Sequence, residues 1–246
     1  DDIDHTRCRP GYTEQIYDDM AFLGLPWRGE PVFQSDRLDR YSQALDRLRE
    51  MDLVYPCFLT RAELAEVLSA PHETPTATDV VLSADEAARR AGSGMAPAWR
   101  LRTAKALELA ESPTWLDLRT GCRRSVDMSA HGDVIVARRD IRASYHLSVV
   151  VDDMIDGVTL VTRGMDLEDS THVHRLLQAI LEIPAPAYYH HDLVCDEEGQ
   201  RLAKRHDALS ISELRQSGLS AMEILSYLPD FAESAIISSD YSVFSN

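Results

Sequence analysis

A strand–helix–strand order between residues 157 and 191 constrains the fold of this chain most. The segment GVTLVTRG, at 157–164, is β-branched and apolar, which predicts a buried strand. Residues 166–183 follow with helical periodicity, and 187–199 read as a further strand and turn. YHLSVVVDD, at 145–153, is a strand candidate ahead of them. Alternating strands and helices predict an α/β sheet domain. The predicted buried side of the helix consists of Val173, Leu176, Leu177, Ile180 and Leu181.

Helices dominate the prediction for the first seventy residues. Residues 12–23 have apolar side chains at helical spacing and stop at a glycine. Ser35 caps a second helix over 36–51, and a capping box predicts a third over 60–70. Between these two helices, 53–59 form a strand candidate with a proline. The predicted core face of the second helix is Leu38, Tyr41, Leu45 and Leu48.

The middle of the chain has a different composition. Residues 71–97 are rich in proline, glycine, threonine and alanine, which indicates an insertion that is partly loop. A β-rich region follows, with strand candidates at 98–102, 114–120 and 132–140. Two short helices are predicted near the end of the chain by the capping pairs Ser210 with Glu213 and Ser220 with Glu223.

The charge distribution is uneven. The chain carries a net charge of −16, which argues against non-specific binding of nucleic acid. Residues 87–142 nevertheless hold eleven Lys and Arg against six Asp and Glu, a net of +5 that leaves −21 elsewhere. Two interpretations stay open: an anionic ligand on one face, or an uneven scatter of charge.

Three segments place reactive side chains where ligands bind in an α/β sheet, beyond the carboxyl ends of its strands. Tyr145 belongs to the first predicted strand together with two aspartates, and Arg163 with a following glycine ends the next one. An arginine there can hold a carboxylate through two hydrogen bonds. The late basic loop, with Arg201 and Lys204, could stay in contact with a phosphate as negative charge develops on it. A plain turn and a solvated loop are the competing interpretations.

No motif in the chain predicts a metal site, a disulfide framework or a membrane span. His172 and His174 do not share a helical face, and His190 and His191 point to opposite sides of a strand. The four cysteines are scattered without close pairs, so we expect a reducing, cytoplasmic setting. No apolar run approaches eighteen residues, so we expect no contact with a membrane.

Four blocks of the chain resemble successive blocks of a glutamyl-tRNA synthetase catalytic domain. They are DDIDHTRCRPGYTEQIYDDMAFLGLPW, QSDRLDRYSQALDRLREMDLVYPCFLTRAEL, YHLSVVVDDMIDGVTLVTRGMDLEDSTHVHRLLQAIL and GQRLAKR. The resemblance implies a class I synthetase with a Rossmann-like α/β catalytic domain. Its two halves would be 1–70 and 136–205, interrupted by an inserted acceptor-binding-like subdomain at 71–135 and followed by a helical segment at 206–246.

The resemblance also implies roles for single residues. RLAKR matches the KMSKS-type loop of the family, so Lys204 would act in catalysis on the ATP phosphates, which Arg201 would also contact. Tyr145, Arg163 and Asp1 match positions that contact glutamate. Asp1 stands where the family has a longer glutamate, and Ala203 stands where the family often has a serine.

Two departures from the family pattern carry expectations of their own. The zinc site of the family begins with a C-x-C pair, and here YPCFLT keeps Cys57 but has Leu59 at the second position. A single thiolate does not hold a structural zinc, so we expect none. The sequence also starts after the first strand and the HIGH-type motif of the family, which we interpret as a truncated copy of the domain.

The resemblance implies an ATP- and Mg²⁺-dependent ligase that activates glutamate. Within the family the chain is most similar to the short paralogues, which place glutamate on the queuosine base of tRNA(Asp), and we expect a monomer. Two alternatives stay open: a catalytic fragment of a full-length glutamyl-tRNA synthetase, and a non-catalytic RNA-binding relic of that fold.

Overall fold

The computed structural model describes residues 2–3, 8–9, 11–60, 63, 82–141, 143–195, 210–226 and 228. Its helices are α1 (Tyr12–Phe22), α2 (Leu38–Glu50), α4 (Ala84–Gly92), α5 (Thr103–Leu109), α6 (Tyr145–Ile155), α7 (Glu168–Ile180), α8 (Ile211–Gln216) and α9 (Ala221–Ser226), with 3-10 turns η1 (Gln34–Arg37) and η3 (Met165–Leu167). Its strands are β1 (Val54–Cys57), β2 (Ala98–Leu101), β3 (Thr114–Asp117), β4 (Cys122–Ser125), β5 (Ile135–Ala137), β6 (Leu160–Gly164) and β7 (Ala187–His191).

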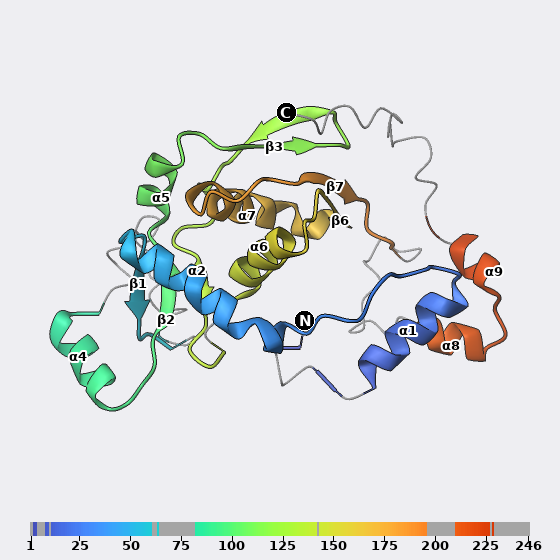
Figure 1. Cartoon of the computed structure of the whole chain (residues 1–246), viewed down its shortest axis with the longest axis horizontal. Coiled ribbons are helices and arrows are strands. Elements are labelled where there is room, and N and C mark those ends of the chain that lie inside the picture. The colour runs from blue at the N-terminus through green and yellow to red at the C-terminus, as the bar shows by residue number, and fades with distance from the viewer. Residues whose placement is uncertain are drawn as a thin grey trace.

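The strands form two sheets. The first has the order β1-β2-β5 and is antiparallel, and it lies beside α4 and α5 on the left of Figure 1. The second has the order β4-β3-β7-β6, in which β7 runs parallel to both β3 and β6. The parallel pair β6 and β7 is connected through α7, as the strand–helix–strand pattern predicts.

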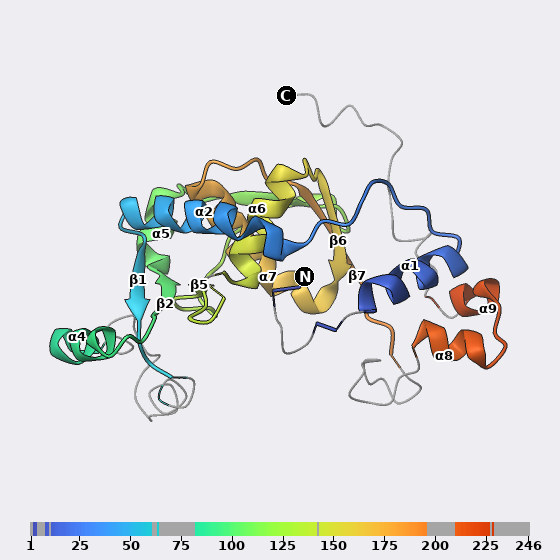
Figure 2. The same ribbon diagram turned by 60° about the horizontal axis from the view of Figure 1, so that its bottom comes forward.

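The main core lies around α2, α6 and α7. The predicted buried side of α7 is confirmed, because all five of its apolar residues are buried. On α2, Tyr41, Leu45 and Leu48 are buried as predicted, whereas Leu38 is exposed at the start of the helix. Helices α1, α8 and α9 lie together at the opposite end of the molecule from the first sheet (Figures 1 and 2). There Arg215 of α8 lies over the ring of Phe22, 5.5 Å from its centre.

The predicted strand at 145–153 is wrong, because this segment is helix α6. Ser144 caps the helix by accepting a hydrogen bond from the backbone N–H of Leu147 at 3.3 Å. Leu147, Val150 and Val151 are buried against neighbouring helices, so packing at helical spacing overrides the strand preference of β-branched residues.

Asp152 and Asp153 therefore lie in the last turns of a helix and not at the end of a strand. Asp152 accepts hydrogen bonds from the Tyr41 hydroxyl at 2.9 Å, from Gln34 at 2.8 Å and from Arg37 at 3.0 Å. These bonds join α6 to α2 and η1, so the carboxylate of Asp152 contributes to the packing of helices.

One further prediction is corrected. Strand β6 is not a buried strand: it lies at the edge of its sheet, with Leu160 exposed and Arg163 as its one buried residue. The predicted insertion contains helix α4, which Ser83 caps by accepting a hydrogen bond from Glu86 N–H. In the predicted helix at 60–70, the capping box of Thr60 and Glu63 forms, and most of the rest lies outside the described residues.

The described helices include none that is both long and apolar enough to cross a membrane.

Candidate active site

The candidate site lies at the carboxyl end of strands β6 and β7. Because β6 and β7 are parallel, Arg163 near the end of β6 is directly paired with His190 near the end of β7. Helix α7 begins a few residues after β6, and the N-terminus of α6 approaches the same point. Four elements that all lie between residues 145 and 191 thus meet around one arginine side chain. Figure 1 shows α6, α7, β6 and β7 gathered in the middle of the molecule.

Arg163 is the centre of this site, and only 9% of it is exposed. Its Nε donates to Nε2 of His190 at 3.2 Å, and its Nη2 donates to the Thr171 hydroxyl at 2.5 Å. Its Nη1 lies 3.2 Å from Nδ1 of His174 and 3.4 Å from the Tyr145 hydroxyl. The ring of Tyr188 lies under the guanidinium, 5.2 Å from its carbon.

The guanidinium fixes the tautomers of the histidines around it. Arginine only donates, so the ring nitrogens that face it, Nε2 of His190 and Nδ1 of His174, carry no proton. The proton of His174 is then on Nε2, from which it can be donated to Nδ1 of His146 at 3.1 Å. A chain of neutral rings therefore leads from Arg163 to His146.

Burial keeps these rings neutral. Desolvation, followed by the positive charge of Arg163, lowers the pKa of His190 to about 4. Desolvation also lowers the pKa of His146 to about 4 and holds the pKa of His174 well below its ordinary value. None of these three histidines balances the positive charge of Arg163.

Asp153 interacts with this charge through space, but no carboxylate of the described residues contacts it. None of them forms an ion pair or hydrogen bond with Arg163. Asp153 is partly buried, and desolvation, followed by the charge of Asp152, raises its pKa to about 6. A nearly buried guanidinium with neutral partners favours an added anion. The site is therefore suited to the carboxylate of a ligand.

Gly164 follows Arg163 because a side chain does not fit there. A Cβ atom on Gly164 would lie 2.4 Å from Oδ1 of Asp166 and 2.9 Å from Cδ2 of Leu193. The close neighbours of this position are thus two side chains of the protein itself.

The structure brings together two of the predicted site residues. Tyr145 opens α6 with 42% of the residue exposed, and its hydroxyl faces Arg163. The other predicted site residues, Asp1, Arg201 and Lys204, lie outside the described residues.

Sequence reasoning missed the inner partners of Arg163. It considered the histidines only as metal ligands, and it did not consider His146 or Thr171 at all. The available signal was the pairing of β6 with β7, because parallel strands in register place Arg163 beside His190. His174 and Thr171 are close in sequence on α7 and both face Arg163.

Metal ligands do not gather anywhere in the described part of the chain: no three His, Cys, Asp or Glu side chains converge there. Cys57, the retained cysteine of the YPCFLT segment, is a buried residue of β1.

The chain matches the family model described as tRNA synthetases class I (E and Q), catalytic domain, over residues 1–235. It is 40% identical to the glutamyl-Q tRNA(Asp) synthetase of Rhodobacter capsulatus over 91% of this chain and 84% of that protein. It is 38% identical to the protein of the same name from Nocardia farcinica, over 94% of this chain and 71% of that protein. Glutamate–tRNA ligase 2 of Gluconobacter oxydans is 36% identical, and the match covers 93% of this chain and 51% of that protein.

Solved structures show the same fold. A glutamate tRNA ligase from Elizabethkingia meningosepticum, crystallised in complex with its amino acid, matches with a TM-score of 0.66 and 22% identity. The match covers 88% of this chain and 45% of that one. The chain therefore belongs to the class I tRNA synthetases of the E and Q group and is a ligase of the aminoacyl-tRNA synthetase type.

Proposed function

We propose that this chain activates glutamate with ATP and transfers it to the queuosine base at the wobble position of tRNA(Asp). The observation that carries the proposal is the Arg163 guanidinium, which is nearly buried and contacts only neutral groups among the described residues. Such a cation is stabilised by a ligand carboxylate. Glutamate has a second carboxylate, on its side chain, that can make this contact while the α-carboxylate reacts.

Arg163 binds the side-chain carboxylate of glutamate in this proposal. A carboxylate held by a guanidinium is a poorer nucleophile, so the α-carboxylate must stay free of Arg163 to attack ATP. His190, Thr171 and His174 hold the guanidinium in one orientation. Tyr145 is more exposed, and its hydroxyl contributes a hydrogen bond at the outer edge of the site. Asp1 would also contact glutamate, an assignment that rests on the family resemblance.

Activation joins the α-carboxylate to the α-phosphate of ATP by in-line attack and releases pyrophosphate. Transfer to the queuosine base then releases AMP. Lys204 and Arg201 would stabilise the charge on the ATP phosphates, an assignment that rests on the resemblance of the RLAKR segment. Mg²⁺ would arrive with ATP and neutralise its phosphates. The described residues offer no cluster of ligands for this ion, so we assign it no protein ligand.

The names of the relatives support the choice of acceptor. The proteins of Rhodobacter capsulatus and Nocardia farcinica are both named for tRNA(Asp), and this chain covers most of each. The competing proposal is a catalytic fragment of a full-length glutamyl-tRNA synthetase, which the match to the Gluconobacter oxydans ligase favours. A non-catalytic RNA-binding relic is the third possibility.

Aminoacylation by the protein with its natural N-terminus tests all three. The assay supplies ATP, Mg²⁺ and labelled glutamate, with queuosine-bearing tRNA(Asp), unmodified tRNA(Asp) and tRNA(Glu) as separate acceptors. We expect label only on queuosine-bearing tRNA(Asp). Label on tRNA(Glu) would instead support the fragment. No label on any acceptor, and no glutamate-dependent exchange of pyrophosphate into ATP, would support the relic.

The role of Lys204 has a matched control in the same chain. Lys204→Ala should lower the rate of pyrophosphate exchange by about 100-fold, since it removes a charge from the reacting phosphates. Lys105→Ala removes the other lysine, which pairs with Asp52 on the surface, and should leave the rate unchanged. Equal rates for the two variants would contradict the assignment.

A further inference from the structure

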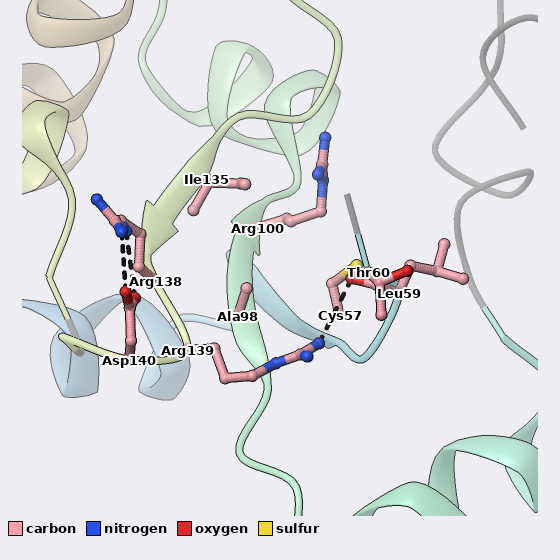
Figure 3. Close-up of a pocket in the computed structure, with 9 residues that line it drawn as sticks. All are labelled: Cys57, Leu59, Thr60, Ala98, Arg100, Ile135, Arg138, Arg139 and Asp140. Carbon is pink, nitrogen blue, oxygen red and sulfur yellow. Dashed lines mark hydrogen bonds and ion pairs between the residues drawn. The ribbon is translucent and has the colours of Figure 1, made fainter. Parts of the chain in front are cut away.

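A cavity of about 420 Å³ lies on the three-stranded sheet, on a different sheet from Arg163. Figure 3 shows that its wall is made by the end of β1 and the loop after it, by β2, and by β5 with the turn that follows. The lining residues are Cys57, Leu59, Thr60, Ala98, Arg100, Ile135, Arg138, Arg139 and Asp140. The proposed glutamate site uses none of them.

Positive charge dominates this cavity. Three of its lining residues are arginines, and Asp140 is its one lining carboxylate among the described residues. Arg138 binds Asp140 through two hydrogen bonds, of 2.8 and 3.2 Å (Figure 3). Arg139 donates from Nη2 to the carbonyl oxygens of Phe58 and Leu59, at 3.1 and 3.4 Å. The side chain of Arg100 has no hydrogen bond or ion pair with any described residue.

The guanidinium groups of Arg100 and Arg139 therefore have no carboxylate partner among the described residues. The Nε atoms of Arg100 and Arg139 are also buried, and neither has a hydrogen-bond partner among the described residues. A buried donor without an acceptor is costly, and a charged one more so. An anion with several oxygen atoms in the cavity would balance the positive charge of these guanidinium groups and could accept from their terminal N–H groups.

We infer that this cavity, which we call the basic cavity, binds a backbone phosphate of the tRNA substrate. Guanidinium groups match the oxygens of a phosphate, and phosphate contacts position a nucleic acid without reading its sequence. Ala98, Ile135 and Leu59 add apolar surface that suits the attached sugar. In a chain of net charge −16, a polyanion needs such a local positive site to bind. The choice of RNA as the source of the phosphate rests on the proposed function.

Direct binding measurements test the inference without requiring catalysis. The probe is queuosine-bearing tRNA(Asp), titrated at several salt concentrations against the natural protein and its variants. Arg100→Gln is the cleanest variant because it breaks no described side-chain hydrogen bond or ion pair, and Arg100→Gln with Arg139→Gln removes both unbalanced charges. Arg40→Gln with Arg123→Gln is the matched control, since it removes two exposed arginines whose side chains have no described hydrogen bond.

We expect the double cavity variant to bind tRNA at least about 5-fold more weakly. The slope of its log binding constant against log salt concentration should become shallower by about 1, because one phosphate contact is lost. The control variant should retain the slope, and Arg100→Lys should restore part of the affinity. Pyrophosphate exchange should keep its KM for glutamate in all variants, because the basic cavity lies apart from Arg163.

Two results would overturn the inference. The first is equal tRNA affinity and salt slope for the folded cavity variants and the natural protein. The second is unchanged tRNA binding together with binding of inorganic phosphate that the cavity variants lose, which would assign the cavity to a small free anion. A protein that binds tRNA through the cavity but forms no glutamyl product would contradict the proposed function alone.

Discussion

Arg163 and His190 are paired residues on the parallel strands β6 and β7, and their side chains are joined by a hydrogen bond of 3.2 Å. The backbone register thus places the Arg163 guanidinium beside a ring nitrogen of His190 that can only accept its hydrogen bond. Because the pKa of His190 is lowered to about 4, this ring is neutral at physiological pH. The pair orients the guanidinium without neutralising it, which leaves its charge for a ligand.

Replacing Arg163 should lower the catalytic efficiency with glutamate while the KM for ATP stays the same. Arg163→Gln removes the charge, and we expect kcat/KM for glutamate to fall by about 10- to 100-fold, since a hydrogen bond to a charged group contributes roughly 1.5–3 kcal/mol. Arg163→Lys keeps the charge but not the fork of donors, so it should recover only part of the loss. Pyrophosphate exchange at varied glutamate concentration measures both variants.

The KM for ATP is the internal control for the Arg163 variants. It should change little, because the partners of Arg163 are the histidines, Thr171 and Tyr145. A parallel loss for ATP and glutamate, or a lower melting temperature that accounts for the loss, would contradict a role in binding glutamate.

Gly164→Ala should destabilise the protein by about 1–3 kcal/mol, the usual cost of overpacking. The new Cβ would overlap Oδ1 of Asp166 and Cδ2 of Leu193, and relief requires the turn after β6 to move. Gly92→Ala is the control, because Gly92 ends α4 and a Cβ added there would meet no atom within 4 Å. Urea unfolding compares the two variants, and equal stability would show that the turn accommodates a methyl group.

Asp152→Asn should lower the free energy of unfolding by about 2 kcal/mol, because the carboxylate accepts charge-assisted or buried hydrogen bonds from Tyr41, Gln34 and Arg37. Asp156→Asn removes the other partner of Arg37, a more exposed carboxylate, and should cost less than about 1 kcal/mol. Chemical denaturation measures both. A larger effect at Asp156 would mean that Asp152 does not join α6 to α2.

Stability should fall as the pH decreases from about 6.5 toward 4. The pKa of His146 and the pKa of His190 are about 4 in the folded protein, against an ordinary value of 6.5, and the pKa of His174 also lies well below that value. The unfolded chain therefore binds more protons in this range, so these histidines contribute stability that is present above pH 6.5 and lost as the pH falls. Asp153 acts in the opposite direction, because its pKa is raised to about 6.

Urea unfolding between pH 7 and pH 5 measures the net effect. His172, whose pKa desolvation also lowers, acts with these three histidines against one aspartate, so the midpoint should decrease with falling pH. His190→Asn should make this dependence weaker. A midpoint that rises toward pH 5 would show that Asp153 dominates, or that the rings are solvated in the folded state.

The elements that were predicted correctly are those with one strong periodicity. Helix α7 has apolar residues at helical spacing and buries all five of the predicted ones. The capping boxes at Ser210 and at Thr60 form as expected, since they depend only on residues three apart. Helix α6 was predicted as a strand because its run of valines has strand preference, and the burial that makes it a helix comes from α2 and α7.

The family, the strand–helix–strand order at 157–191, and Arg163 and Tyr145 as candidates for one ligand could all be read from the sequence. These features depend on local periodicity and on motifs that are short in sequence. The folded structure was needed to show that two histidines and a threonine contact Arg163, that a third histidine lies behind them, and that Arg100 and Arg139 line one cavity. Such groups meet through strand register and helix packing, which depend on contacts between distant parts of the chain.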